Sequence, residues 1–278
     1  MALNSVNTNM GAAVALQSLN RTNDALAVTQ KRISTGFRVA DAKDDGAAFA
    51  VAQAVRADIA GLTSANEQIG GVKGVLDTTL SSLNKVSETM GEIRGVLVKL
   101  ADGTLSDSQR TQYQSQYDSL RTQVSNYISD ATYNGRTLLS TASAAGSVGG
   151  NIATVRNESG TTYTLSAVDG ANLTVASTTF TAAAAATALA SGGDFATKMA
   201  AVSTALNTFG SNNKYLEGQV SYNKEKMDAL ETGLGALVDA DLAKESAKLQ
   251  ALQIKQQLGT QSLSIANQAP QSLLSLFR

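Results

Sequence analysis

Apolar residues recur at every seventh position along one long stretch of the chain, and this spacing constrains the fold more than any other feature. The series runs through Ala48, Val55, Leu62, Ile69, Leu76, Leu83, Met90 and Leu97. Residues spaced by seven lie on one side of an α-helix, so the pattern predicts a continuous helix over residues 44–100. Such a helix is about 80 Å long, more than one compact globule can cover. The chain's only proline is at position 270, so none would break this helix.

Two further stretches have the spacing of buried helix faces. The first contains the series Tyr113, Tyr117, Leu120, Val124 and Tyr127. It predicts a helix over residues 106–129, followed by a Tyr-Asn-Gly turn at 133–135. The second has the same spacing of three and four over residues 195–237. We expect the three helices to pack as an antiparallel bundle that folds in the monomer.

Three aspartates, Asp41, Asp44 and Asp45, precede the long predicted helix. Acidic side chains suit a helix start because they accept hydrogen bonds from its unpaired N–H groups and complement its dipole. We therefore predict that Asp41 is the N-cap and that the other two lie in the first turn. A catalytic carboxylate pair is the alternative interpretation. Because the chain contains no histidine, helix capping and charged contacts with another chain are favoured.

Two other features resemble binding sites superficially. The segment Gly-Gly-Val-Lys-Gly at 70–74 lacks the spacing of a phosphate-binding loop and lies inside the heptad series. Its glycines, each costing about 1 kcal/mol relative to alanine, indicate a soft or closely packed point of the helix. Tyr113, Tyr117 and Tyr127 could form a stacking platform, but their helical spacing favours core packing.

Residues 141–190 differ in character from the rest, because Ser, Thr, Gly and Ala dominate them. Short alternating pieces at 151–155, 162–165 and 172–175, separated by turn sequences, predict two or three strands of a β-hairpin region. The low-complexity run 181–190 is either the start of the returning helix or a loop. The predicted fold class is therefore mainly α, a long antiparallel helical bundle or coiled coil with a small β-hairpin region in the middle.

The composition excludes several classes of chemistry. The chain has no Cys, no His and no Trp, which excludes thiol and imidazole nucleophiles and the common zinc sites. Its 22 basic residues balance 23 acidic ones without a basic run, so nucleic acid and anionic membranes are not expected partners. We also expect neither a cleaved signal peptide nor a transmembrane span. No catalytic, metal or cofactor site is predicted, and the protein is not expected to be an enzyme.

Both ends of the chain carry apolar seams of their own. The front seam shifts register between Ala13 and Leu16, and the back segment is apolar on more than one face between Ala247 and Ile265. A pair of helices cannot cover that much apolar surface, and a large exposed apolar area marks an interaction site. The residues alone therefore predict polymerisation or docking to a partner.

Three motifs in this order resemble those of bacterial flagellins. Residues 32–45 read Arg-Ile-Ser-Thr-Gly-Phe-Arg-Val-Ala-Asp-Ala-Lys-Asp-Asp, similar to the family's Arg-Leu-Ser-Ser-Gly-Leu-Arg-Ile-Asn-Ser-Ala-Lys-Asp-Asp. Residues 131–139 read Ala-Thr-Tyr-Asn-Gly-Arg-Thr-Leu-Leu, similar to Thr-x-Phe-Asn-Gly-x-x-Leu-Leu. Residues 266–278 read Ala-Asn-Gln-Ala-Pro-Gln-Ser-Leu-Leu-Ser-Leu-Phe-Arg, similar to Ala-Asn-Gln-x-Pro-Gln-x-x-Leu-Ser-Leu-Leu-Arg. With its short middle, the chain most resembles short flagellins of alphaproteobacterial type.

The resemblance implies a structural subunit that polymerises into the flagellar filament for swimming motility, with its terminal helices driving self-assembly. Residues 1–40 with 239–278 would form an inner terminal coiled-coil domain. Residues 41–140 with 190–238 would form a helical-bundle domain, and residues 141–190 a short β-hairpin insert. A hook–filament junction protein is the alternative, since it shares the terminal helical patterns. A secretion needle or coiled-coil tether would explain the heptads but not the motifs.

The resemblance also implies partners and a location. The partners would be other flagellin subunits, the flagellar cap and hook-associated junction proteins, the flagellar export apparatus and a secretion chaperone. The protein would be secreted through the flagellum's own channel and would be extracellular. O-linked glycans on Ser and Thr of the middle region are expected by analogy with the family.

Contacts between subunits are expected in both ends and in one segment of the long helix. The expected contact residues are Ile33, Phe37, Arg38, Asp41, Lys43, Asp44, Asp45, Arg94, Leu249, Ile254, Leu258, Leu273, Leu274, Leu276, Phe277 and Arg278. Arg94 belongs to Gly-Glu-Ile-Arg-Gly-Val at 91–96, where many flagellins have Gln-Arg-Val-Arg-Glu-Leu. In the family that stretch is linked to subunit contacts and to innate immune receptor binding, and Glu92 replaces its first arginine here.

Overall fold

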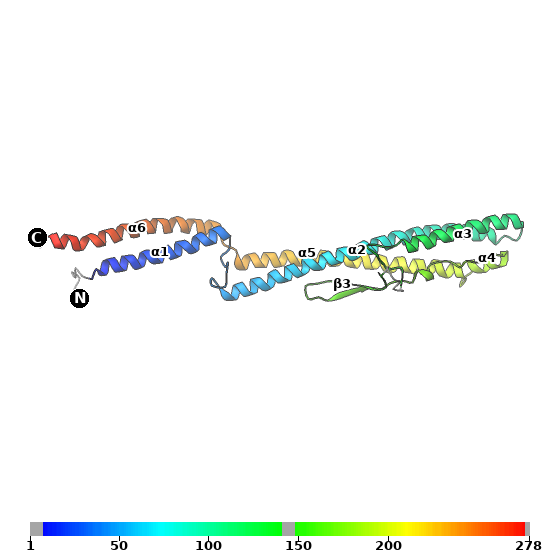
Figure 1. Cartoon of the computed structure of the whole chain (residues 1–278), viewed down its shortest axis with the longest axis horizontal. Coiled ribbons are helices and arrows are strands. Elements are labelled where there is room, and N and C mark those ends of the chain that lie inside the picture. The colour runs from blue at the N-terminus through cyan, green and yellow to red at the C-terminus, as the bar shows by residue number, and fades with distance from the viewer. Residues whose placement is uncertain (1–7, 141–147, 276–278) are drawn as a thin grey trace. The chain divides into compact units, whose positions relative to one another are not determined.

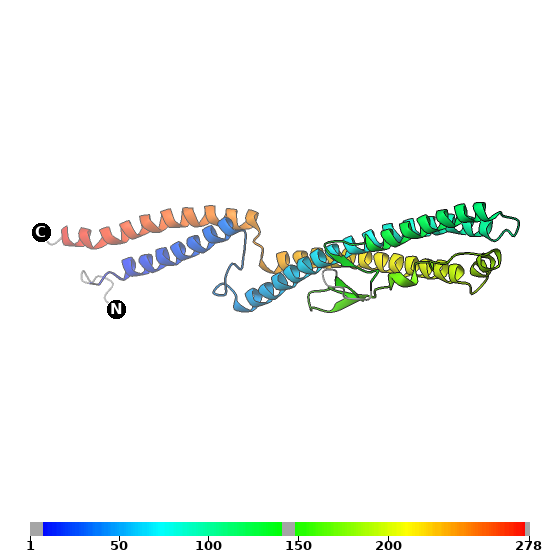
Figure 2. The ribbon, with the colours of Figure 1, turned by 45° about the vertical axis from the view of Figure 1, so that its right-hand side comes forward.

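A computed structural model of the chain describes residues 8–140 and 148–275 (Figures 1 and 2). Its longer elements are the helices α1 (Met10–Thr35), α2 (Gly46–Leu100), α3 (Asp107–Ser129), α4 (Ala182–Leu189), α5 (Asp194–Val238) and α6 (Leu242–Ser275). The strands are β1 (Arg136–Thr137), β2 (Val148–Gly149), β3 (Ile152–Val155) and β4 (Thr162–Leu165). The mainly helical fold with a small antiparallel hairpin in the middle confirms the predicted fold class.

The chain divides into two compact units. The terminal unit consists of Met1–Ala57 and Ala229–Arg278, and the bundle unit of Asp58–Asp228. α2 and α5 contribute residues to both units, whereas α3, α4 and the strands belong to the bundle unit alone.

The heptad series of α2 contributes Ile69 and each later member to the core cluster of the bundle unit. From Leu62 to Leu97 each of its members is at most 1% exposed. Side chains of α3 and α5 join the same apolar cluster: Tyr117, Leu120, Val124, Val202, Phe209 and Leu216. Burying a side chain of this size stabilises a fold by about 1.5–3 kcal/mol. The three predicted helices therefore share one core, and their observed bounds agree with the predicted bounds to within two residues.

The start of α2 differs from the prediction. Asp45 caps the helix, because its Oδ1 accepts hydrogen bonds from the backbone N–H groups of Ala47 at 3.1 Å and Ala48 at 3.0 Å. Asp41 Oδ1 instead accepts from the backbone N–H of Lys43 at 2.8 Å. The predictions of Asp41 as the N-cap and of Asp44 and Asp45 in the first turn were wrong, because the chain completes a separate turn before the helix begins at Gly46.

α3 has the terminal chemistry of a stable helix. Ser106 and Gln109 form a capping box, in which each side chain accepts a hydrogen bond from the other's backbone N–H. After the helix, Asn134 and Gly135 have positive φ angles of 49° and 73°, and Tyr133 pairs with Arg136 across them. This confirms the predicted turn, which needs residues that tolerate positive φ at both central positions.

The middle segment, residues 141–190, contains two strands at predicted positions, β3 and β4, and a further strand, β2, that was not predicted. β3 and β4 pair antiparallel from Ile152 opposite Leu165 to Val155 opposite Thr162, as predicted. Of the two or three strands predicted, two therefore form, and the piece at 172–175 is not a strand. A 3₁₀ turn at Gly170–Asn172 runs into it, and Asp169 caps that turn by accepting from the N–H of Ala171. The parallel pair β1–β2 was not predicted. The run 181–190 forms the separate helix α4, capped by Thr181.

The glycines of α2 do not interrupt the helix. Gly70 and Gly71 have open space where a side chain would be, whereas Gly74 lies under the ring of Tyr133, 2.8 Å from the position of a Cβ. A side chain at position 74 would therefore collide with the Tyr-Asn-Gly turn. The expected close packing is present at Gly74 alone.

Tyr117 serves core packing, as its helical spacing predicted. It is 1% exposed, and its ring meets the edge of Phe180 with 4.9 Å between centroids. Its hydroxyl donates to the carbonyl of Ala176 at 2.7 Å, and burial raises the pKa of the phenol. The contact joins α3 to the segment between η1 (Gly170–Asn172) and α4.

Candidate functional site

The two terminal helices, α1 and α6, lie side by side and antiparallel (Figures 1 and 2). Three polar contacts define their alignment. Asn9 Nδ2 donates to the carbonyl of Ala266 at 2.7 Å, Gln256 Nε2 donates to Asn23 Oδ1 at 2.8 Å, and Arg32 Nη1 meets Glu245 Oε1 at 3.1 Å. The start of α1 is therefore beside the end of α6, which agrees with the antiparallel pairing expected of two ends of one chain.

The pair buries very little. Within the described parts of α1 and α6, only Thr29, at 0% exposed, and Leu252, at 8%, are buried. The Thr29 hydroxyl has no hydrogen-bond partner among the described residues. Burial of this side chain therefore contributes little to the stability of the pair. A pair of helices with so small a core cannot offset the entropy of ordering its residues, about 1–2 kcal/mol each.

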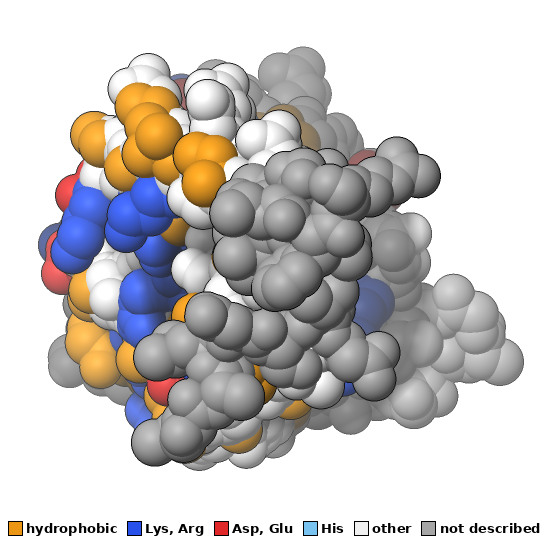
Figure 3. All heavy atoms as spheres, turned by 90° about the vertical axis from the view of Figure 1, so that its left-hand side faces the viewer, with side chains coloured by type: hydrophobic (Ala, Val, Ile, Leu, Met, Phe, Trp, Pro, Cys, Tyr) orange, Lys and Arg blue, Asp and Glu red, His pale blue; other side chains and the backbone are white. Residues whose placement is uncertain are grey.

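Large apolar side chains instead stand on the outer faces of the pair. The exposed ones are Met10 at 70%, Val14 at 61%, Leu16 at 48%, Val28 at 41%, Leu242 at 49%, Ile254 at 58%, Leu258 at 61% and Ile265 at 63%. Ile254, Leu258 and Ile265 are spaced by four and seven, so they form one stripe along α6. Figure 3, which faces the end where α1 begins and α6 ends, shows hydrophobic side chains uncovered beside Lys and Arg side chains.

A shallow groove of about 440 Å³ runs between the two helices, lined by Gly11, Val14, Ala15, Ser18, Thr22, Lys255, Leu258, Gly259, Ser262 and Ala266. Most of these residues are small, so the helices leave an apolar depression bordered by Val14 and Leu258. The groove and the exposed stripe together form a continuous surface suited to another apolar helix.

Two connectors join the terminal helices to the bundle helices. The first, residues 36–45, runs from α1 to α2, and the second, residues 239–241, runs from α5 to α6. Hydrogen bonds link the two connectors. Gly36 is the C-cap of α1. It has a φ of 74°, and its backbone N–H donates a hydrogen bond to the carbonyl of Arg32. Beyond it, the backbone N–H of Arg38 donates to the carbonyl of Val238 at 2.7 Å, and the N–H of Ala240 donates to the carbonyl of Gly36 at 2.8 Å. The outgoing and returning chains are thus joined by backbone hydrogen bonds.

A small apolar cluster supports this junction. Val39, Ala52 and Val238 are buried, and Phe49 and Leu237 pack against them. Phe37 lies outside the cluster at 37% exposed, with the Arg56 guanidinium 5.6 Å from its ring centroid. The cluster holds the first connector against the end of α5.

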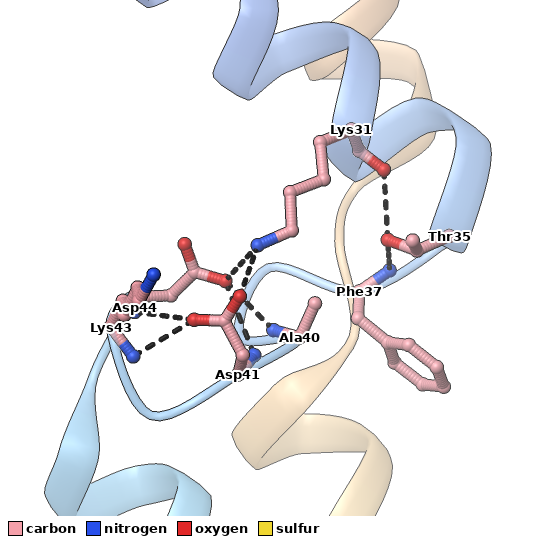
Figure 4. Close-up of polar contacts among 7 residues, drawn as sticks. All are labelled: Lys31, Thr35, Phe37, Ala40, Asp41, Lys43 and Asp44. Carbon is pink, nitrogen blue, oxygen red and sulfur yellow. Dashed lines mark hydrogen bonds and ion pairs between the residues drawn. The ribbon is translucent and has the colours of Figure 1, made fainter.

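Lys31 and two aspartates close the first connector, as Figure 4 shows. Lys31 Nζ lies 2.7 Å from Asp41 Oδ2 and 3.1 Å from Asp44 Oδ2. Asp44 Oδ2 also accepts the backbone N–H of Ala40 at 3.1 Å. The hydrogen bonds with Lys31 lower the pKa of both carboxyls and raise the pKa of the lysine. These three side chains are termed the connector latch.

The structure brings the front group of predicted residues together but not the rest. Asp41, Asp44 and Asp45 all act inside the connector, and Arg38 Nη2 donates to the carbonyl of Leu237. Ile33 is half-buried, and Lys43 is exposed and contributes its backbone N–H.

Other predicted residues stand apart from the connector. Arg94 is exposed on α2 in the bundle unit, next to the buried Ile93. Leu249 is half-buried on α6, whereas Ile254 and Leu258 are exposed there. The backbone of α6 includes positions 273 and 274, but the side chains of Leu273 and Leu274 lie outside the described part, as do Leu276, Phe277 and Arg278 entirely.

Sequence reasoning missed several residues that organise this site. Lys31 precedes the first motif by one position, and Arg32 with Glu245 forms an ion pair between residues at opposite ends of the chain. The only available signal was opposite charge at positions that antiparallel pairing brings to the same level. Asn9, which caps α1 by accepting from the N–H of Ala12, carried no periodic signal at all.

Neither a metal-binding cluster nor a membrane-spanning helix is found among the described residues. Within them, no group of three or more acidic side chains is placed to hold a metal ion. Within the same ranges, every helix is too short or too polar to span a bilayer.

Comparison with known proteins gives consistent matches at both ends. Residues 6–144 match the bacterial flagellin N-terminal helical region, and residues 194–277 match the bacterial flagellin C-terminal helical region. Flagellin FljK of Caulobacter vibrioides is 38% identical over 100% of both chains, and a flagellin of Brucella melitensis is 34% identical over 99% of both. The crystal structure of Bacillus cereus flagellin covers 66% of this chain and 94% of its own with 18% identity and a TM-score of 0.36.

Proposed function

The chain belongs to the bacterial flagellin family, and we propose that its terminal helix pair is the surface through which subunits join in the filament. As a flagellin it is a structural subunit that polymerises into the flagellar filament and is not an enzyme. The family match and the names of the relatives favour the filament subunit, and no observed feature favours the hook-junction alternative.

The observation that carries the proposal is the stripe of exposed apolar side chains on α6. Ile254 and Leu258 are 58% and 61% exposed, although their helix already has a partner in α1. Covering one such side chain completely stabilises an interface by up to about 1.5–3 kcal/mol. A helix pair that buries so little and exposes such a stripe is half of an interface, and a neighbouring subunit supplies the other half.

Point substitutions test this assignment without removing any segment. Ile254→Asn and Leu258→Asn place amides on the exposed stripe, where the isolated chain loses no core contact. We expect both variants to keep the circular dichroism of the parent but to raise, by roughly tenfold or more, the subunit concentration needed for filaments to grow from added fragments.

Tyr222→Ser is the matched control, because Tyr222 is also 58% exposed but lies on α5 in the bundle unit. It is expected to polymerise like the parent. If Ile254→Asn and Leu258→Asn polymerise as readily as Tyr222→Ser, the stripe is not the assembly surface. A parent chain that never extends filament fragments would point to a junction protein instead.

The contact residues and the layers of the subunit complete the proposal. Residues 1–40 with 239–278 form the inner terminal domain, residues 41–140 with 190–238 the bundle domain, and 141–190 the short insert. Ile33, Phe37, Leu249 and the residues from Leu273 onward would contact neighbouring subunits along the inner domain. Arg94 would do so from the exposed face of α2, where its exposure supports the assignment.

A subunit of the flagellar filament also meets other proteins during export and assembly. The chain would leave the cell through the flagellar export apparatus with a secretion chaperone, and would meet the cap and hook-associated junction proteins at the ends of the extracellular filament. O-linked glycans would attach in the middle segment, where Ser177, Thr178 and Thr179 are consecutively exposed. An intact mass of the native protein equal to the sequence mass would remove the glycans from this proposal.

A further inference from the structure

The apolar seam between α2 and α5 does not by itself specify how the two helices are aligned. Apolar residues of α2 repeat every seven positions, and those of α5 recur at spacings of three and four. Sliding one helix by seven residues would again place apolar side chains opposite apolar side chains. That slip moves a helix by about 10 Å along its axis. Some other feature must therefore distinguish the native alignment from the slipped one.

One asparagine interrupts the apolar seam of α5 at a fully buried position. Asn223 is 0% exposed, and its Nδ2 donates to Asn66 Oδ1 on α2 at 2.8 Å. The same Nδ2 donates to the backbone carbonyl of Arg156 at 3.0 Å, and Asn223 Oδ1 accepts from Gln219 Nε2 at 2.9 Å. Every polar atom of the buried side chain has a partner, and those partners come from three separate parts of the chain.

The hairpin turn that supplies the Arg156 carbonyl rests on both helices. Glu158 Oε1 lies 2.6 Å from Lys226 Nζ on α5. On the other side, a Cβ at Gly61 of α2 would lie 3.1 Å from the Glu158 Cβ and 3.2 Å from its Cα, so any side chain there would push the turn away by at least a few tenths of an ångström. The turn can occupy this place only when Gly61 and Lys226 are at the same level.

We propose that Asn66, Asn223 and the turn at Arg156–Glu158 form a polar clasp that specifies the alignment of α2 against α5. In a slipped alignment Asn66 would face Leu216 or Leu230 in place of Asn223. Asn223 would lie at the level of Ile59 or Lys73 and would lose its hydrogen bond with Asn66. Loss of a partner by a buried polar group disfavours a structure strongly. A single buried asparagine sets helix register in coiled coils for the same reason. This inference concerns the bundle unit alone and does not depend on the assembly surface proposed above.

Disulfide trapping in the full-length chain tests the clasp, and the absence of native cysteine makes the background clean. Thr63→Cys with Met227→Cys reports the native alignment, since Thr63 Oγ1 and Met227 Sδ are 3.6 Å apart. Thr63→Cys with Val220→Cys reports a slip of seven residues in one direction. Lys73→Cys with Lys224→Cys reports the opposite slip. Lys73 natively pairs with Glu217 at 2.9 Å, and Lys224 lies seven residues after Glu217.

When the cysteine pairs are placed in the otherwise unchanged chain, only the pair that reports the native alignment should form a disulfide. In Asn66→Leu/Asn223→Leu, which removes the polar pair but preserves an apolar seam, at least one of the slipped disulfides should rise roughly tenfold or more. Asn213→Leu is the matched control on α5, because Asn213 Oδ1 is buried and has no hydrogen-bond partner in the part of the chain that the structure describes. It should leave the trapping pattern of the parent unchanged.

Unchanged trapping in the double leucine variant would overturn the proposal, as would an equal rise in Asn213→Leu. If the double variant loses its helical circular dichroism, Gly61→Val provides a second route, since it displaces the turn and leaves both asparagines in place. Slipped disulfides in Gly61→Val would support the clasp, and their absence would contradict it.

Discussion

The bundle unit and the terminal helix pair are built from the same kind of apolar repeat, yet only one of them buries it. Leu83 in the bundle is 0% exposed, whereas Leu258 in the terminal pair is 61% exposed. The difference lies in the packing of the described helices: α2, α3 and α5 surround a common core, whereas α1 packs along α6 as a pair. Periodicity thus shows which side of a helix is apolar, and the number of neighbours within the chain decides whether that side is covered.

The polar contacts differ in the same way. In the bundle, Asn223 is fully buried and all its polar side-chain atoms are paired. In the terminal unit, the Lys31 and Asp41 side chains of the connector latch remain 40% and 46% exposed. Solvent screens such ion pairs, which limits their contribution to stability. We therefore expect the bundle to resist substitutions at its surface and the terminal unit to depend on assembly.

Removing residues 239–278 should give the largest difference between the two regions. α6 and its exposed stripe would be lost, whereas the core cluster of the bundle unit would keep all its members. We expect a largely helical monomer that does not form filaments, measured by circular dichroism and by sedimentation after seeding with filament fragments. Filaments that still grow from the shortened chain would show that the C-terminal helix is not needed for assembly.

Truncating one leucine in each region should give the next largest contrast. Leu83→Ala opens a cavity in the core and should lower the free energy of unfolding of the monomer by about 2–5 kcal/mol. Leu258→Ala removes a side chain that is already in water, so it should change monomer stability by less than about 0.5 kcal/mol. Urea denaturation of unassembled protein measures both values. Equal losses in the two variants would mean that the terminal pair has a core of its own in solution.

Neutralising the connector latch should have the smallest effect. Asp41→Asn/Asp44→Asn removes the negative charges that pair with Lys31 and leaves only neutral amide acceptors. The backbone N–H groups of the connector should therefore exchange with deuterium faster, while the monomer keeps its unfolding midpoint. Lys85→Gln, which breaks an exposed ion pair with Glu88 on α2, is the control and should leave connector exchange unchanged.

The latch should also respond to pH in a defined direction. Lys31 lowers the folded-state pKa of both carboxyls, so their contribution is present above the unfolded pKa of about 4 and is lost as the pH falls through the lowered values. The raised pKa of Lys31 means that its contribution is present below about pH 10 and is lost at higher pH. Faster connector exchange at neutral pH than in acid, after correction for intrinsic rates, would contradict this assignment.

Sequence reasoning was most successful where a pattern extended over many residues. The helices α2, α3 and α5 and the hairpin β3–β4 follow from periodicity and turn residues, which are local properties. It failed where one hydrogen bond decided between alternatives. Asp45 rather than Asp41 caps α2, and Asp169 caps a 3₁₀ turn at the piece whose assignment as a third strand the sequence left open. The side chains of Asp41 and Asp45 are chemically identical, so only the path of the connector distinguishes them.

The exposed apolar stripe was foreseeable as an excess of apolar faces on α6, but which of those faces α1 would cover was not. Ile254 and Leu258 were predicted contacts, whereas the similarly apolar Leu252 turned out to be the residue buried against α1. A shift of two residues around a helix changes the side it faces, and the seams of the two ends are too irregular to determine that rotation.

By itself the sequence determined that the chain would form long helices, that its ends would have more apolar surface than a pair could bury, and that it resembles flagellins. These conclusions follow from composition, spacing and motifs, which need no knowledge of what lies opposite. Only the tertiary structure decided which faces are covered, how the connectors are tied and how Asn223 finds its partners. Those outcomes depend on residues far apart in the chain meeting at one level, and a local pattern carries no information about that meeting.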